Sequence, residues 1–171
     1  MIFVTVGTHT PFDRLIRAVD EWASLENRSD VFAQIGDTQT HPRFIRYQQF
    51  LSPEEYGFQL RSASLVVGHA GTGTLLTSLQ NAKPLVMMPR HSILRETRND
   101  HQIAMAARFQ NYPGIYVAHN ENSLATQINK ALSDLEHNPE VAAFLDNAKN
   151  NRGGSASAQL INAIRKFIAD K

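Results

Sequence analysis

A glycine-rich turn between an apolar run and a helical pattern is the stretch of this sequence best suited to chemistry. The run Leu65–Val67 has strand length and β-branched residues, the segment Gly68–Thr74 (GHAGTGT) follows it, and leucines at helical spacing come next. Thr72 or Thr74 can cap that helix. Because the first N–H groups of a helix lack partners and the helix dipole is positive there, such a turn can bind phosphate.

The spacing of these glycines leaves the kind of phosphate site open. It is neither GxGxxG nor GxxxxGK[ST], so it predicts neither a dinucleotide-binding fingerprint nor a P-loop. A plain turn between a strand and a helix stays open as the alternative. His69, inside the turn, is a candidate base, a candidate phosphate donor or an ordinary hydrogen-bonded loop residue.

Two further polar segments, 7–12 and 89–102, also follow apolar runs. In the second of them, Asp100 and Gln102 can exchange hydrogen bonds with the hydroxyl groups of a polyol such as a sugar. The arginines of that segment, at positions 90, 95 and 98, can pair with a phosphate or a carboxylate. The alternatives are a polar first helical turn, with Asn99 as its cap, and a solvated loop.

The elements that must position these residues alternate between strand and helix. Expected strands cover 2–6, 31–35, 44–50, 65–67, 84–88 and 115–118, and expected helices cover 12–25, 53–62, 75–82, 100–109, 123–135, 141–148 and 156–168. This alternation predicts an α/β fold, a Rossmann-like parallel sheet with helices on both faces. Since ligands of such sheets bind beyond the carboxyl ends of the strands, we expect the three polar segments to converge there.

Length and composition are those of an ordinary soluble domain. The chain has 171 residues, 42% of them hydrophobic and 19% charged, so a single domain over 1–171 is expected. A net charge of +1 provides no basic field for nucleic acid. The absence of cysteine excludes disulfides, thiolate catalysis and cysteine metal sites, and fits the cytoplasm. The first residues enter a strand without the pattern of a signal peptide, and no apolar run approaches the roughly 20 residues of a membrane span.

Other catalytic patterns are missing from the sequence. There is no HExxH, no DxD element and no GxSxG elbow. We therefore expect neither a metal site nor a Ser-His-Asp hydrolase.

Three segments together resemble the C-terminal domain of glycosyltransferase family 28: TVGTHTPFDRLIRAVDEW, VVGHAGTGTLLTSLQNAKPLVMMPR and RETRNDHQIAMAARF. The resemblance covers about Met1–Phe167, and the specific feature is the HAGxGT turn followed further on by NDHQ. More narrowly, the chain is similar to stand-alone versions of this domain. These are the PssE-type bacterial subunits of exopolysaccharide and capsule assembly, and the catalytic subunit of the two-part GlcNAc transferase that acts on N-glycan precursors.

The resemblance implies the C-terminal, donor-binding half of a GT-B glycosyltransferase, with a UDP-sugar lying across the strand ends. In that family the HAGxGT turn holds the diphosphate, the first loop closes on it, and the NDHQ segment touches the hydroxyl groups of the sugar. Donor contacts carried over in this way come from Gly7, Thr8, His69, Gly71, Thr72, Gly73, Thr74, Arg90, Glu96, Asp100 and Gln102.

The reaction implied is an inverting, metal-independent transfer with no cofactor besides the UDP-sugar, which is a UDP-glucuronate in PssE-type relatives. The acceptor would be a lipid-linked saccharide held by a membrane-anchored, PssD-type partner subunit, which would recruit this chain from the cytoplasm to the inner face of the plasma membrane. The general base would lie on that partner, and His9 is the candidate within this chain. Two alternatives stay open: a non-catalytic enhancer that stabilises a partner transferase, and an unrelated α/β nucleotide-binding module.

Overall fold

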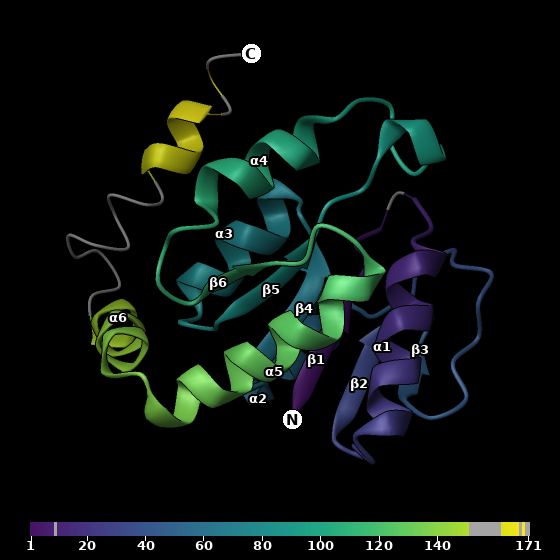
Figure 1. Cartoon of the computed structure of the whole chain (residues 1–171), viewed down its shortest axis with the longest axis horizontal. Coiled ribbons are helices and arrows are strands. Elements are labelled where there is room, and N and C mark those ends of the chain that lie inside the picture. Colours follow the sequence, from purple (N-terminus) through teal and green to yellow (C-terminus); the bar gives the residue numbers. More distant parts are fainter. Residues whose placement is uncertain (9, 151–161, 168, 170–171) are drawn as a thin grey trace.

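The computed structural model describes residues 1–8, 10–150, 162–167 and 169, and within them one parallel sheet forms the centre of the protein (Figure 1). Its six strands are β1 (Ile2–Thr5), β2 (Val31–Gln34), β3 (Arg46–Gln48), β4 (Leu65–His69), β5 (Leu85–Met88) and β6 (Ile115–Val117). They lie in the order β3-β2-β1-β4-β5-β6, and every neighbouring pair is parallel. This is the doubly wound order of Rossmann-like sheets, as the alternating pattern predicted.

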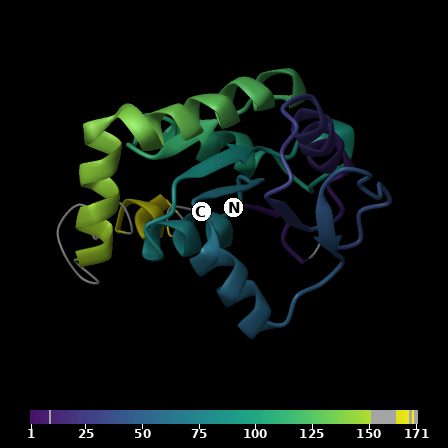
Figure 2. The same ribbon diagram turned by 90° about the horizontal axis from the view of Figure 1, so that it is seen from below.

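Helices cover both faces of the sheet, which Figure 2 shows edge-on. The helices are α1 (Asp13–Leu25), α2 (Pro53–Ser62), α3 (Thr72–Gln80), the single 3₁₀ turn η1 (Ser92–Leu94), α4 (His101–Phe109), α5 (Glu121–His137) and α6 (Pro139–Asn150). One core lies between the sheet and helices α1 and α5, and the other between the sheet and helices α2, α3 and α4. Strand β1 serves both, because Ile2 and Val4 face the first core and Phe3 faces the second.

The start of α2 follows the predicted chemistry. The Ser52 hydroxyl accepts from the Glu55 N–H at 3.2 Å, and the Glu55 carboxylate accepts from the Ser52 N–H at 2.7 Å. This reciprocal capping box, with Pro53 at the first helical position, begins the helix where the sequence predicted.

The starts of α3 and α4 differ from prediction. Helix α3 begins at Thr72 with Gly71 as its N-cap, and no side chain caps it, so the predicted capping role of Thr72 or Thr74 is wrong. Thr74 is buried inside the first turn, where its hydroxyl turns to His69. Helix α4 has Asp100 at its N-cap position, although the Asn99 side chain still accepts from the N–H of His101 at 3.2 Å.

Strand β3 is shorter than the predicted 44–50 and is exposed along its whole length. As an edge strand it pairs with β2 alone, and the ladder of paired residues covers only 46–48. The predicted last helix, 156–168, lies mostly outside the described residues. Residues 162–167 are helical there, and Ile164 is fully buried in the core beside α4.

The strand order reverses direction between β1 and β4. The chain leaves β1 toward one side of the sheet and leaves β4 toward the other, so the loops after these strands diverge and open a crevice at their carboxyl ends. Gly7 begins the first of these loops and Gly71 lies in the second. The fold therefore places the glycine-rich turn at the position where open α/β sheets bind ligands.

Candidate functional site

The three polar segments singled out in the sequence meet at the carboxyl ends of β1, β4 and β5. The Arg90 guanidinium, just after β5, donates to the carbonyls of Val6 and Thr10 in the first loop, at 2.8 and 2.5 Å. The ring of His69, at the end of β4, lies against Gly7 of that loop. The predicted convergence of 7–12, 68–74 and 89–102 is confirmed.

The His69 ring occupies a slot between two glycines. A Cβ atom on Gly7 would lie 2.8 Å from His69 Cε1, and one on Gly71 would lie 2.2 Å from His69 Nε2. Gly7 also has φ of +78°, a backbone conformation that favours glycine. The hydroxyl of Thr74 completes the slot, with its Oγ1 at 3.3 Å from His69 Nδ1. These glycines are therefore required to seat an imidazole as well as to shape a turn.

The slot keeps His69 uncharged. Burial, and then repulsion by the Arg90 guanidinium, lowers its pKa to about 4, and a hydrogen bond to the Thr5 backbone offsets only part of this. At neutral pH one ring nitrogen is a donor and the other an acceptor. Because the ring has partners in the Thr5 backbone and the Thr74 hydroxyl, the neutral imidazole shapes the turn without placing a positive charge in it.

The buried position of His69 predicts that the stability of the protein depends on pH. The pKa of His69 is about 4 in the folded protein and near 6.5 in the unfolded chain, so between these values the unfolded state binds more protons. The free energy of unfolding should therefore fall by about 2–3 kcal/mol as pH drops from 6.5 to 4. Urea denaturation of the parent and of His69→Asn across this range should show the steeper loss in the parent, because carboxyl groups with lowered pKa values, such as Asp30 and Glu121, add a slope to both. The exposed His119, replaced by glutamine, is the control and should keep the slope.

The N-terminus of α3 faces open space. A Cβ atom built on Gly73 would meet nothing within 4 Å, whereas one on Gly68 would lie 2.9 Å from the carbonyl oxygen of Thr5. Gly73 is exposed and Thr72 is half-buried. The first N–H groups of the helix, at residues 72–74, point toward this space because the helix itself offers them no acceptors. The turn thus combines partnerless donors, a positive dipole end and room for a ligand.

Arg90 is a buried cation that ties the site together. Its side chain is only 4% exposed, it stacks over the Phe12 ring with Cζ 4.9 Å from the centroid, and burial lowers its pKa to about 10. It remains charged at neutral pH. Its Nε has no hydrogen-bond acceptor in the described structure. Arg90 thus holds the first loop in place, and the donor contact suggested by the resemblance stays a prediction.

Glu96 belongs to an ion-pair network that sequence reasoning missed. Its carboxylate accepts two hydrogen bonds from the Arg14 guanidinium, at 2.8 and 2.9 Å, and a third from the N–H of His91 at 3.0 Å. Arg14 also pairs with Glu121 at 2.9 Å and donates to the carbonyl of Pro89 at 3.1 Å. The network joins α1, the segment after β5 and α5. Nothing in the local pattern of Arg14 distinguishes it from a surface arginine of α1.

Asp100 and Gln102 shape the same segment. Asp100 Oδ1 accepts from the N–H of Ser92 at 2.9 Å, and Gln102 Oε1 accepts from the N–H of Arg90 at 3.1 Å. Asp100 is exposed and Gln102 is half-buried. Hydrogen bonds from the Ser92 backbone and side chain lower the pKa of Asp100. The amide NH₂ of Gln102 forms no hydrogen bond with the described residues, so it retains donor capacity for a ligand.

Thr8 is exposed in the first loop, next to Gly7. His9, the candidate base, lies outside the described residues. Among the residues that the structure describes, no three His, Asp or Glu side chains gather closely enough to hold a metal ion.

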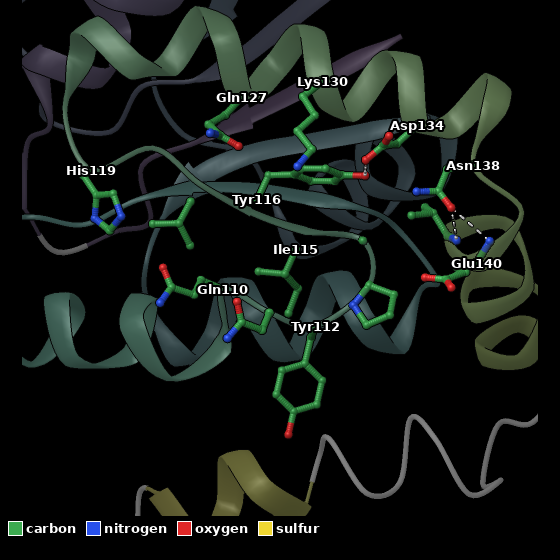
Figure 3. A pocket seen from close by; sticks show the side chains of 15 residues that line it. Gln110, Tyr112, Ile115, Tyr116, His119, Gln127, Lys130, Asp134, Asn138 and Glu140 are labelled. Carbon is green, nitrogen blue, oxygen red and sulfur yellow. Dashed lines mark hydrogen bonds between the residues drawn. The ribbon is translucent and has the colours of Figure 1, made fainter.

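A cavity among the described residues lies away from this crevice, beside the edge strand β6 (Figure 3). It measures about 410 Å³, and its walls come from β6, the preceding turn and α5. Tyr116 donates to Asp134 at 2.9 Å across its rim, and Lys130 reaches over it from α5. None of the predicted site residues lines it.

Comparison with known proteins identifies the fold that carries this crevice. The family model of the glycosyltransferase family 28 C-terminal domain matches residues 1–164. The chain belongs to this family. The buried His69 and the open turn at Gly73 both lie in the HAGxGT segment that carries the resemblance to this family.

Relatives and solved structures agree with this assignment. The UDP-N-acetylglucosamine transferase subunit ALG13 of Homo sapiens is 34% identical over 115 residues, which are 61% of this chain and 10% of that protein. The ALG13 solution structure matches 84% of this chain and 94% of its own, with 19% identity and a TM-score of 0.57. The calicheamicin glycosyltransferase CalG4 matches 99% of this chain and 43% of its own, with 16% identity and a TM-score of 0.62. This chain thus matches less than half of CalG4 and a tenth of human ALG13.

Proposed function

We propose that this chain is the donor-binding, catalytic subunit of a two-component inverting glycosyltransferase that uses a UDP-sugar. The observation that carries the proposal is the open N-terminus of α3, at Gly73, beside the seated neutral imidazole of His69. It supports binding of a diphosphate, because the first backbone N–H donors of α3 have no partner within the helix and the space at Gly73 is open. Family membership and the ALG13 relatives support a nucleotide sugar as the ligand that contains this diphosphate.

The chemistry follows from that position of the diphosphate. The oxygen of an acceptor hydroxyl attacks the anomeric carbon of the sugar, and the bond from that carbon to the β-phosphate oxygen breaks. The electron pair leaves with UDP, where the N–H groups of residues 72–74 stabilise the developing charge. The proton of the hydroxyl passes to a general base. We place that base on a partner subunit, with His9 as the candidate within this chain.

For the sugar we propose glucuronic acid, with N-acetylglucosamine as the competing candidate. Glucuronic acid is supported by the resemblance to PssE-type subunits and by an arginine next to the NDHQ segment, which could pair with the carboxylate of the sugar. Since Arg90 is committed to backbone carbonyls, the carboxylate partner would be the exposed Arg98. The second rests on the ALG13 relatives, whose name specifies UDP-N-acetylglucosamine.

We further propose a lipid-linked acceptor, a polyprenyl-diphosphate saccharide of exopolysaccharide or capsule assembly, held by a membrane-anchored PssD-type partner at the cytoplasmic face of the membrane. The support is that the relatives are named as subunits and that this chain spans less than half of CalG4, a chain of the same fold. None of the described helices is both long and apolar enough to cross a membrane.

Calorimetric titration of the purified chain with UDP, and then with UDP-glucuronate, UDP-N-acetylglucosamine, UDP-glucose and UDP-galactose, tests the proposal. We expect UDP to bind and one UDP-sugar to bind more tightly than UDP. Gly73→Asp should weaken UDP binding at least about tenfold, because a carboxylate would occupy the vacant space in front of the helix. The matched control is Asn122→Asp, which adds the same charge at the second position of α5 and should leave binding unchanged.

The same titration on this chain co-expressed with its partner separates the remaining outcomes. Binding that needs the partner and is still lost in Gly73→Asp would keep the donor site here and complete it across the interface. A pair that transfers sugar at the parental rate with Gly73→Asp would make this chain an enhancer and overturn the proposal.

A further inference from the structure

The segment that contains the edge strand β3 exposes three aromatic side chains. Phe44, Tyr47 and Phe50 lie at every third position of the sequence FIRYQQF and are 61%, 41% and 44% exposed. Strand β3 forms one edge of the sheet, beside α1, and β6 forms the other (Figure 1). Natural edge strands are commonly protected by lysine or proline, because an open edge can pair with another chain. The segment 44–50 contains neither, so this edge favours association.

The opposite edge is protected. The side chains of Ile115 and Val117 on β6 are buried, and polar side chains that include Gln127 and Lys130 line the cavity beside this strand (Figure 3). A charged side chain over an edge strand opposes pairing with another chain. The two edges of the sheet therefore differ, and the aromatic edge at β3 is the one suited to pairing.

The backbone of Tyr47 presents a donor and an acceptor on the outer side of β3. The carbonyl of Gln48 accepts from the N–H of Ile35 at 3.0 Å, so the hydrogen-bonding groups of Gln48 face β2. Since these groups point to opposite sides in successive residues of a strand, the N–H and C=O of Tyr47 point away from β2. Within the described part of the chain β3 pairs with β2 alone, so both groups are available to a second strand.

The ends of β3 are fixed by the rest of the protein. The Asp20 carboxylate on α1 accepts from three successive backbone N–H groups, at residues 43–45, over 2.9 to 3.0 Å. After the strand, the N–H of Gly36 donates to the carbonyl of Gln49 at 2.8 Å. Because the strand is already ordered, pairing with its outer side costs little conformational entropy.

The aromatic pattern is symmetric about Tyr47. When two copies of β3 pair antiparallel around a two-fold axis at Tyr47, the two Tyr47 residues form a hydrogen-bonded pair that uses both outward-facing backbone groups. Phe44 then lies opposite the second copy's Phe50, and Arg46 lies opposite the second copy's Gln48. No like charges lie directly opposite each other in this register. The strand is therefore complementary to a second copy of itself.

We propose that β3 is the interface of a symmetric homodimer, in which two copies pair antiparallel about Tyr47 and join their six-stranded sheets into one. The three exposed aromatic side chains contribute roughly 300 Å² of buried surface per copy, since one buried aromatic side chain contributes about 150–250 Å². The dimer thus buries roughly 600 Å² of aromatic surface, about half of what the smaller stable interfaces bury in total. The paired backbones and the exposed side chains of Arg46, Gln48 and Gln49 add to this area.

The symmetry of the dimer has a consequence for the crevice. Because the paired strands run in opposite directions, the carboxyl ends of the two sheets, and with them the two crevices, lie at opposite ends of the joined sheet. Each crevice stays accessible to its own ligand. The inference goes beyond the proposed transfer reaction and does not depend on it, because it concerns self-association of this chain alone.

Sedimentation equilibrium of the purified chain tests the proposal. We expect the mass to rise from 19.1 kDa toward twice that value with concentration, with a Kd of about 10 μM. Tyr47→Pro should weaken dimerisation at least about tenfold, because proline removes the N–H that crosses the interface and leaves the N–H groups that face β2. The double variant Phe44→Asp with Phe50→Asp should also weaken it at least about tenfold, because it places carboxylates in the aromatic surface.

Matched controls are available on other surfaces. Leu25, 81% exposed at the end of α1, and Ile93, 87% exposed in η1, are each replaced by aspartate, and both variants should dimerise like the parent. Thermal unfolding of each variant shows that the fold is kept.

Single cysteines test the register, because the chain has no cysteine of its own. In a hydrogen-bonded antiparallel pair the two Cα atoms at position 47 lie about 5.5 Å apart, within the range of a disulfide. Mild oxidation of Tyr47→Cys should therefore give a covalent dimer. Arg46→Cys is the matched control, since position 46 is also exposed but lies diagonal to its counterpart, with Cβ atoms about 7–8 Å apart, too far for a disulfide. It should oxidise at least about fivefold more slowly.

Three outcomes would contradict the proposal. The first is a parent chain that keeps a mass of 19.1 kDa up to about 100 μM. The second is a dimer that survives both Tyr47→Pro and the Phe44→Asp, Phe50→Asp double variant, because another surface would then hold it. The third is a monomeric parent whose double variant loses co-purification with a partner subunit, because β3 would then be an interface for a different protein.

Discussion

The Arg90→Met variant is expected to lose about 2–4 kcal/mol of unfolding free energy, although methionine fills much of the same volume. The guanidinium donates to the carbonyls of Val6 and Thr10 and lies over the ring of Phe12. Methionine offers no donor, so the Val6 carbonyl, whose bond to Arg90 is buried, is left without this partner. Urea denaturation followed by circular dichroism measures the difference.

Arg98→Met is the matched control, because Arg98 is an exposed arginine of the segment that follows Arg90. It should change stability by less than about 0.5 kcal/mol. Arg90→Lys should fall between the two, since an ammonium keeps the charge but lacks the planar fork of a guanidinium. If Arg90→Met were as stable as Arg98→Met, the buried guanidinium would not stabilise the first loop, and the glycines would determine the shape of the site.

The order and type of the elements could be predicted from the sequence because the strands are short apolar runs and the helices have clear apolar faces. Strand β3 shows where this reasoning weakens. The sequence predicted a strand over 44–50, but residues Arg46–Gln48 are all exposed and the edge position limits the strand to these three residues. The start of α3 shows a second limit. A threonine in the first turn suggests a cap, but in the fold Thr74 turns to His69.

The location of the site could also be predicted, because parallel strands bring their carboxyl ends together. The contacts between side chains inside the site could not be predicted. The resemblance implied that Arg90 and Glu96 contact a ligand, whereas the contacts that the structure gives them are with the protein itself. Arg14, which pairs with Glu96 across 82 positions of the sequence, has no local pattern that reveals it. Contacts of that sequence separation depend on how helices pack on the sheet, which periodicity does not specify.

Two glycines only two positions apart should respond to alanine in opposite ways. Gly71→Ala should destabilise the protein by about 1–3 kcal/mol, because its Cβ would lie 2.2 Å from His69 Nε2. The backbone itself is not the cause, since Gly71 has φ of −96°, which any residue can adopt. Gly73→Ala should keep or slightly raise stability, because its Cβ meets nothing within 4 Å and alanine favours a helix. Under the proposed function it should still weaken UDP binding at least about tenfold, since the methyl group occupies the space of the diphosphate.

A double-mutant cycle identifies the cause of the Gly71 effect. If the methyl group acts by displacing the imidazole, Gly71→Ala should cost little in a His69→Ala background, and the coupling between the two changes should approach the full effect of Gly71→Ala. Equal costs in both backgrounds would locate the strain elsewhere in the turn. Unfolding free energies and UDP titrations of the same variants then separate two roles of this turn. Gly71→Ala should lose stability because it displaces the His69 ring. Gly73→Ala should keep stability and lose UDP binding because it fills the open space in front of α3.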